Sequence, residues 1–197
     1  MQDVLFSLLA FTAATTFTPG PNVLLVTASG ANFGFRRTLP HMFGVVVGFP
    51  LMTVAIGLGL GEMFKATPYL HTILKYVATA YLLYLAYRIA TARRHRDGVG
   101  RAQPMTFIGA VAFQWVNPKA WMMAIAAISA YTTVGGNAVV ETLLIALMFG
   151  VVSVPGVGVW ALFGTAIGRF LETDNAMRLF NLAMAGLLIA SLVPMFV

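Results

Sequence analysis

Six long apolar stretches, separated by short polar turns, dominate the pattern of this chain. They run over about 3–30, 38–61, 68–90, 106–131, 138–166 and 174–196. Each reaches the roughly 20 residues that a helix needs to cross the hydrocarbon core of a bilayer. The pattern therefore predicts an all-α integral membrane protein with six transmembrane helices, and it leaves little chain for a soluble domain.

Two of the stretches are broken by proline and polar residues at matching places. The breaks are Thr18-Pro19-Gly20-Pro21-Asn22 in the first stretch and Asn117-Pro118-Lys119 in the fourth. They divide the chain into repeat 1 (about 1–90), an Arg-rich linker (91–105) and repeat 2 (about 106–197). Because each half holds an odd number of helices, the halves insert in opposite directions. The sequence predicts a single membrane domain over 1–197, made of two inverted three-helix repeats with broken helices 1 and 4.

The basic residues indicate which loops face the cytoplasm. The formal net charge is +6, with 12 Lys and Arg against six Asp and Glu. Nine arginines lie on or beside the first, third and fifth loops: Arg36, Arg37, Arg88, Arg93, Arg94, Arg96, Arg101, Arg169 and Arg178. Cytoplasmic loops carry the excess of Lys and Arg, so the linker is predicted to be cytoplasmic and both termini periplasmic, in a bacterial inner membrane. The basic linker is expected to contact anionic lipid rather than nucleic acid.

Each break has the form of a new helix start within the membrane. Thr18 before Pro19, and Asn117 before Pro118, look like N-cap residues followed by proline at the first helical position. The first N–H groups of such half-helices lack partners, and their dipoles are positive at that end. In an inverted repeat the two ends face each other at the midplane, which favours binding of a carboxylate. Two ordinary proline kinks are the alternative.

Lys119 and three amides are the polar side chains beside these breaks. A charge near mid-membrane is costly and therefore indicates function. Lys119 is predicted to pair with a substrate carboxylate, and the alternative is that it snorkels to an interface. Asn22, Gln114 and Asn117 suit an amino or hydroxyl group, or else satisfy the broken backbone. The candidate substrate-binding residues are Thr18, Pro19, Gly20, Pro21, Asn22, Gln114, Asn117, Pro118 and Lys119.

Several function classes are excluded by what the sequence lacks. There are no cysteines, and all six Asp and Glu lie near helix ends or in loops. His41 and His71 lie near helix ends and His95 in the linker, so these histidines are predicted to be interfacial. No metalloprotease, serine-hydrolase or nucleotide-binding motif is present. The sequence therefore predicts no enzyme, no catalytic residues, no cofactor and no metal.

Small residues recur four positions apart in the second and fifth stretches. The pairs are Gly44/Gly48, Gly57/Gly61 and Gly164/Gly168. Such faces allow two helix backbones to approach closely. Tight packing within the chain is the first interpretation, and a homodimer interface or a moving gate is the alternative.

The motifs at the breaks resemble those of a known transporter family. Thr18-Pro19-Gly20-Pro21-Asn22, then Ser29-Gly30 and Gly34-Phe35-Arg36-Arg37, are similar to the first-helix signature of the lysine exporter (LysE) and homoserine/threonine efflux (RhtB) family. Phe113-Gln114-Trp115-Val116-Asn117-Pro118-Lys119 resembles its fourth-helix signature. The stretch around Gly34–Arg37, Ile89-Ala90-Thr91 and Phe113-Gln114 resembles the branch that includes cysteine/O-acetylserine exporters.

The resemblance implies an exporter of amino acids or close derivatives from the cytoplasm, driven by the proton gradient. Many members carry an acidic residue in the second helix where this chain has Gly48-Phe49-Pro50, so the family pattern supplies no proton-coupling residue. A passive channel for small polar solutes and a non-transporting membrane scaffold are the alternatives.

Overall fold

The protein is described here from a computed structural model, which covers residues 2–61, 67–92, 103–133 and 135–196. All regular structure in these ranges is helical. The helices are α1 (Gln2–Phe17), α2 (Pro21–Phe33), α3 (Phe35–Ala55), η1 (Ile56–Leu60), α5 (Pro68–Ala90), α6 (Phe107–Gln114), α7 (Pro118–Tyr131), α8 (Ala138–Phe170), α9 (Asp174–Ala190) and η2 (Val193–Met195). The linker arginines Arg93, Arg94, Arg96 and Arg101, together with His95, lie outside the described residues.

Fewer helices are long and apolar enough to span a membrane than the six apolar stretches predict. Three meet this description: Phe35–Leu60, Ala138–Phe170 and Asp174–Met195. The bent pair α1 and α2, which meet at 54°, makes a fourth if it forms one span. The fourth stretch is divided into α6 and α7, of eight and 14 residues. In α5, Lys75, Arg88 and five tyrosines dilute the apolar character.

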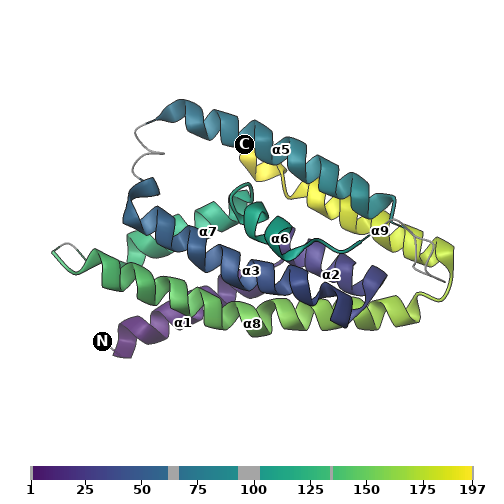
Figure 1. Ribbon diagram of the computed structural model, residues 1–197, viewed down its shortest axis with the longest axis horizontal. Helices are drawn as coiled ribbons and strands as arrows, with labels where there is room; N and C mark the ends of the chain where they lie inside the picture. The colour runs from purple at the N-terminus through teal and green to yellow at the C-terminus, as the bar shows by residue number, and fades with distance from the viewer. Residues whose placement is uncertain (1, 62–66, 93–102, 134, 197) are drawn as a thin grey trace.

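The helices run back and forth along the long axis of the molecule. In Figure 1, α3 and α8 lie together, α5 and α9 pair along the opposite edge, and α6 and α7 lie between these groups. α2 and α3 both pack on α8, and α3 also packs on α6. At the two helix breaks, the starts of α2 and α7 are buried at Gly20, Pro21 and Asn117, whereas the end of α1 at Phe17, Thr18 and Pro19 is exposed.

Close backbone contacts hold α2 and α3 to their neighbours. Gly164 and Gly168 of α8 lie directly against the backbone of α2 at Thr27 and Ala31. Gly44 and Gly48 of α3 lie in the same way against α6 at Phe107, Ala110 and Val111, and Gly57 lies against Thr142. The predicted close approach of helix backbones is thus confirmed at Gly44, Gly48, Gly164 and Gly168, whereas Gly57 meets only the side chain of Thr142 and Gly61 lies beside the nearby Ile56, as far as the described residues show.

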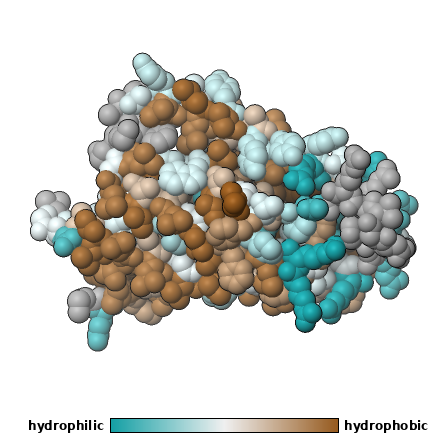
Figure 2. Space-filling view, viewed as in Figure 1, coloured by the Kyte–Doolittle hydropathy of each residue, from teal (hydrophilic) through white to brown (hydrophobic). Residues whose placement is uncertain are grey.

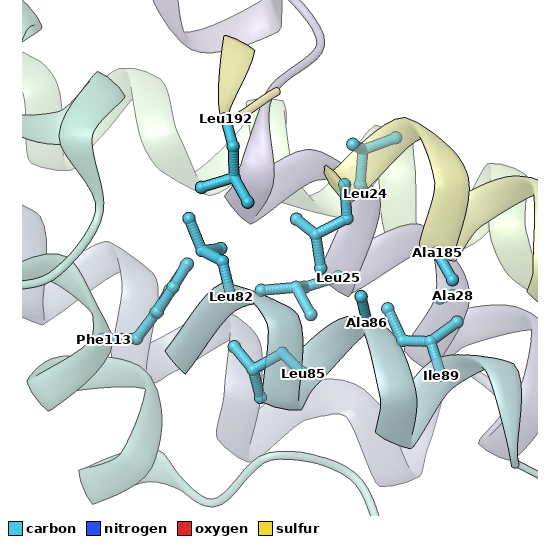
Figure 3. Close-up of a cluster of buried hydrophobic side chains, with 11 residues drawn as sticks. Leu24, Leu25, Ala28, Leu82, Leu85, Ala86, Ile89, Phe113, Ala185 and Leu192 are labelled. Carbon is cyan, nitrogen blue, oxygen red and sulfur yellow. The ribbon is translucent and has the colours of Figure 1, made fainter. Parts of the chain in front are cut away.

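A cluster of buried apolar side chains joins the α5–α9 pair to the rest of the protein. Figure 3 shows Leu82, Leu85 and Ile89 of α5 packed against Leu24 and Leu25 of α2. The same cluster is completed by Ala28, Ala86, Phe113, Ala185, Leu188 and Leu192. Since this core includes both α2 and α6, it connects α5 and α9 to the helices that form the two breaks.

The surface is mostly apolar, with polar groups gathered at one end. Large apolar side chains such as Phe6, Ile108 and Phe170 are largely exposed. Hydrophilic residues gather at the end where α3 begins and α8 passes into α9 (Figure 2). Exposed apolar surface on this scale is typical of a protein that faces lipid.

Candidate functional site

The first break lies between α1 and α2, and its local structure differs from the prediction. Thr18 is not the N-cap of α2. Its hydroxyl donates to the carbonyl oxygen of Ala14 at 2.5 Å, so it belongs to the end of α1. The N-cap is Gly20, without a side-chain cap, and Pro21 rather than Pro19 takes the first helical position. Both Pro19 and Pro21 have a φ suited to a helix start, and the helix begins at Pro21, which follows the extended Gly20.

The second break follows the predicted form more closely. Asn117 is the N-cap of α7 and Pro118 takes the first helical position. The Asn117 side chain does not cap the helix, and its Oδ1 is buried without a hydrogen-bond partner among the described residues. The Trp121 indole N–H donates to the Trp115 carbonyl oxygen at 2.9 Å, which satisfies one backbone acceptor freed by the break.

A reciprocal amide pair links the two breaks. Asn22 Nδ2 donates to Gln114 Oε1 at 2.8 Å, and Gln114 Nε2 donates to Asn22 Oδ1 at 3.1 Å. Gln114 Nε2 also donates to the Ala110 carbonyl oxygen at 2.9 Å. Gln114 is fully buried, so its hydrogen-bonding groups are paired where no bulk water reaches them. This pair fixes the first turn of α2 against the end of α6.

Lys119 provides a second link between the breaks. Its Nζ donates to the carbonyl oxygen of Thr18 at 2.5 Å and lies 3.4 Å from that of Pro19. The end of a helix carries unpaired carbonyl groups and a partial negative charge, which a cation stabilises. The ammonium of α7 therefore satisfies the end of α1. Gly20 leaves room for it, since a Cβ there would lie 2.5 Å from Lys119 Cδ.

A cavity lies between the breaks, with a volume of about 40 Å³. The first turns of both half-helices line it, through Gly20, Asn22 and Val23 of α2 and Asn117, Lys119 and Ala120 of α7. Its remaining walls come from α1, α3, α7 and α8: Thr15, Thr16, Thr18, Val45, Phe49, Met123, Ser153 and Val157. This space is large enough for a few water molecules. A few polar groups among apolar walls are typical of small-molecule sites.

Of the nine candidate residues, five line this cavity and four do not. Thr18, Gly20, Asn22, Asn117 and Lys119 are in the lining. Gln114 instead positions Asn22 from the side. The three prolines, Pro19, Pro21 and Pro118, belong to the backbone of the two breaks rather than to the lining.

Sequence reasoning missed a second polar region around His41. The prediction that His41 is interfacial is wrong, because its side chain is 1% exposed in the interior of α3. Neither ring nitrogen has a hydrogen-bond partner among the described residues. His41 and Asn32 line a second cavity, separate from the one between the breaks. Asn32 exchanges two hydrogen bonds with Asn181 of α9. The available signal was the spacing of His41, Val45 and Phe49, which places them on one helix face.

Comparison with known proteins decides the family. A family model described as "LysE type translocator" matches residues 13–193. The chain belongs to the LysE family of translocators. Similar proteins include the cysteine/O-acetylserine efflux proteins of Escherichia coli strain K12 and of strain E24377A, each 29% identical over 94% of both chains. The protein of the same name from Escherichia coli O1:K1 is 28% identical over the same share. No solved structure matches this chain.

As a member of the LysE family, the protein is a membrane transporter and not an enzyme. The side chains at its two breaks therefore need no catalytic interpretation. Within the part of the chain that the structure describes, no three His, Cys, Asp or Glu residues lie close enough to hold a metal ion. In this LysE-type translocator, the cavity between the breaks brings together Thr18, Asn22, Asn117 and Lys119, four of the polar residues that the sequence singled out.

Proposed function

We propose that this translocator exports small amino acids or close derivatives, such as cysteine and O-acetylserine, from the bacterial cytoplasm. The names of the related efflux proteins support this substrate class. The observation that carries the proposal is the cavity lined by the first turns of both half-helices. Backbone left open at this depth is tolerated only inside a protein or at a wet cavity, and paired broken helices mark transporter sites.

The cavity offers complementary groups for both charges of a zwitterion. The substrate carboxylate binds at the first turns of α2 and α7, where unpaired N–H groups and the positive ends of the helix dipoles meet. The substrate ammonium donates to Asn117 Oδ1, a buried acceptor that has no partner within the described part of the chain. The carboxylate of a small amino acid thus accepts from the unpaired N–H groups, and its ammonium donates to Asn117 Oδ1.

Lys119 attracts the substrate carboxylate through the positive charge of its ammonium, which lies at the first break. Its ammonium has three N–H donors, and two carbonyl oxygens lie close to it. One donor stays available for a carboxylate, so Lys119 joins the end of α1 to the bound anion. The other candidate residues, Thr18, Pro19, Gly20, Pro21, Asn22, Gln114 and Pro118, shape the two breaks or line the cavity between them.

We further propose a six-crossing inverted repeat, with α1/α2 matched to α6/α7, α3 to α8, and α5 to α9. If the two repeats are related by a two-fold axis, α1 and α2 should pack on α8 in the way that α6 and α7 pack on α3. The same axis should place α5 beside α9. The observed packing has both features. The bent helix pairs then cross as single broken spans.

The arginines of the described residues support an inner-membrane orientation with both termini periplasmic. Arg36 and Arg37 begin α3, Arg88 ends α5 and Arg169 ends α8. In Figure 1 these positions, with the start of α9 near Arg178, lie toward one end of the molecule. Basic residues face the cytoplasm, so we assign this end to the inside and to contact with anionic lipid.

Transport in reconstituted vesicles tests the function. Purified protein in liposomes is expected to move labelled cysteine against its gradient when an inward proton gradient is imposed, and a protonophore is expected to abolish this movement. Strictly downhill flux would instead identify a passive channel. Absence of cysteine and O-acetylserine flux, together with no gain of resistance to any amino acid in an overexpressing strain, would favour the scaffold alternative.

A further inference from the structure

The structure contains a second cavity further along α2, toward its C-terminal end, and His41 lines it. Its volume is about 60 Å³. α2 contributes Ser29 and Asn32, α5 contributes Arg88, and Gln103 lies before α6. The other lining residues are Leu25, Ala28, Phe33, Leu85, Ile89, Ala92, Pro104 and Met105. This cavity therefore lies near the end of the molecule that we assign to the cytoplasm.

His41 is the unpaired polar group of this cavity. The neighbouring polar side chains have partners: Ser29 Oγ lies 3.0 Å from Thr38 Oγ1, Asn32 pairs with Asn181, and Arg88 donates to the Gln103 carbonyl oxygen. Both nitrogens of His41 lack a protein partner in the described part of the chain. A neutral imidazole needs one donor and one acceptor. Ser29, Asn32, Arg88 and Gln103 are the other polar residues of the mostly apolar lining, and the missing donor and acceptor have to come from a water molecule beside them.

Few other ionisable groups face His41. Arg88 of α5 is the charged residue that lines the cavity with it. α2 and α6 pack on α3 or line the same cavity and contain no ionisable side chain. The ionisable residues of α7 and α8 are Lys119, Tyr131, Glu141 and Arg169, and the cavity lining does not include them. On α3 itself, Arg36 and Arg37 precede His41. A proton on His41 therefore has no carboxylate among the described lining residues to trap it.

His41 lies one helical turn from the cavity between the breaks. Val45 and Phe49 line that cavity and follow His41 at intervals of four residues on α3. Residues four apart share a helix face and are separated by about 6 Å along the axis. One face of α3 thus contributes His41 to the second cavity and, one and two turns further on, Val45 and Phe49 to the cavity between the breaks. Pro40 and Pro50, on either side of this segment, each remove a backbone donor from α3.

We propose that His41 is the proton-carrying residue of this transporter. The imidazole takes up a proton from the side of the substrate cavity and releases it through its own cavity to the cytoplasm, while the amino acid leaves in the opposite direction. A solvated histidine changes its charge near neutral pH, and the burial of His41 favours the uncharged imidazole, so the residue holds a proton only in passing. No Asp or Glu occupies the middle of an apolar stretch to carry the proton instead. This inference rests on the proposed export function and adds the coupling residue.

The test separates coupled from uncoupled transport in proteoliposomes of the full chain. Cysteine–cysteine exchange at equal pH needs no net proton movement, whereas a cysteine gradient drives proton flux only in a coupled carrier. For His41→Gln and His41→Met we expect exchange to stay within about twofold of the wild type and cysteine-driven proton flux to fall about tenfold or more. Uphill accumulation should disappear in both variants.

Thr53→Val is the matched control on the same helix. Thr53 is buried and its hydroxyl donates to the Phe49 carbonyl oxygen of its own helix, so this variant should keep both exchange and proton flux. Retained proton flux in either His41 variant overturns the proposal. Loss of exchange in both variants overturns it as well, because His41 would then serve the fold or the substrate site. Wild-type exchange without proton flux overturns proton coupling alone, whereas a wild type without exchange overturns the export function itself.

Discussion

Asn22 and Gln114, 92 positions apart in the chain, exchange two hydrogen bonds of 2.8 and 3.1 Å across the centre of the protein. Each residue stands beside one of the two helix breaks. Their pairing is what brings the start of α2 to the end of α6. Three tests concern this pair and the cavity beside it, and two more concern the packing of α2 on α8 and the orientation in the membrane.

The amide pair is expected to stabilise the fold because each side chain satisfies the hydrogen-bonding groups of the other. Asn22→Leu leaves the buried Gln114 amide with unpaired groups, so we expect the free energy of unfolding to fall by about 1–3 kcal/mol. Gln114→Leu should have a similar effect. The double variant should cost less than the sum of the two, since no polar group is then left alone. Unfolding in detergent micelles measures all three, and strictly additive costs would contradict the pairing.

Lys119 is expected to need both its charge and its shape. Lys119→Met removes the donor at the Thr18 carbonyl, so we expect export to fall about tenfold or more, with some loss of stability. Lys119→Arg should also impair export, because a planar guanidinium does not fit the narrow space beside Gly20. Lys75→Met is the matched control, since Lys75 lies on α5, with its ammonium over the ring of Phe196. Near-normal export by Lys119→Met would remove this residue from the mechanism.

Asn117 is expected to separate binding from stability. Its Oδ1 has no protein partner among the described residues, so Asn117→Leu removes no hydrogen bond from that atom. We expect unchanged or slightly higher stability and a KM for export raised about tenfold or more, because the substrate ammonium loses its acceptor. Transport kinetics and thermal unfolding of the same preparation give the two values. A destabilised variant with an unchanged KM would show that Asn117 serves the fold.

The contact of α2 with α8 is expected to tolerate no side chain at Gly164. An added Cβ would overlap the carbonyl oxygen of Thr27, a backbone atom that cannot move aside by itself. We expect Gly164→Ala to lower the free energy of unfolding by about 1–3 kcal/mol. Gly158→Ala lies on the same helix with nothing within 4 Å of its Cβ position, so it should be neutral or slightly stabilising. Equal effects of the two substitutions would disprove the close packing.

The orientation can be tested directly because the chain contains no cysteine. Ala138→Cys lies in an exposed position at the start of α8, and Asn175→Cys lies in an exposed position at the start of α9. In intact cells we expect an impermeant thiol reagent to label the first and not the second. After the membrane is opened, both should react. The opposite pattern would reverse the topology and place the basic end of the protein outside.

The sequence by itself determined the features that depend on local chemistry. Long apolar stretches predicted a helical membrane protein, since no other regular structure satisfies the backbone within one segment in lipid. Proline next to polar residues predicted where α2 and α7 begin, to within a few positions, because proline fixes φ and lacks an N–H. The motifs around those prolines also identified the family, which the match over residues 13–193 confirmed.

Only the tertiary structure decided which partners these residues have. Thr18 closes α1 instead of opening α2, because the carbonyl of Ala14 is within its reach. The Lys119 ammonium binds the end of α1, a contact between residues 101 positions apart. His41 is buried although it lies only six residues into α3, because helices distant in the sequence cover it. Hydropathy and spacing describe single helices, whereas burial and hydrogen-bond partners depend on how those helices pack together.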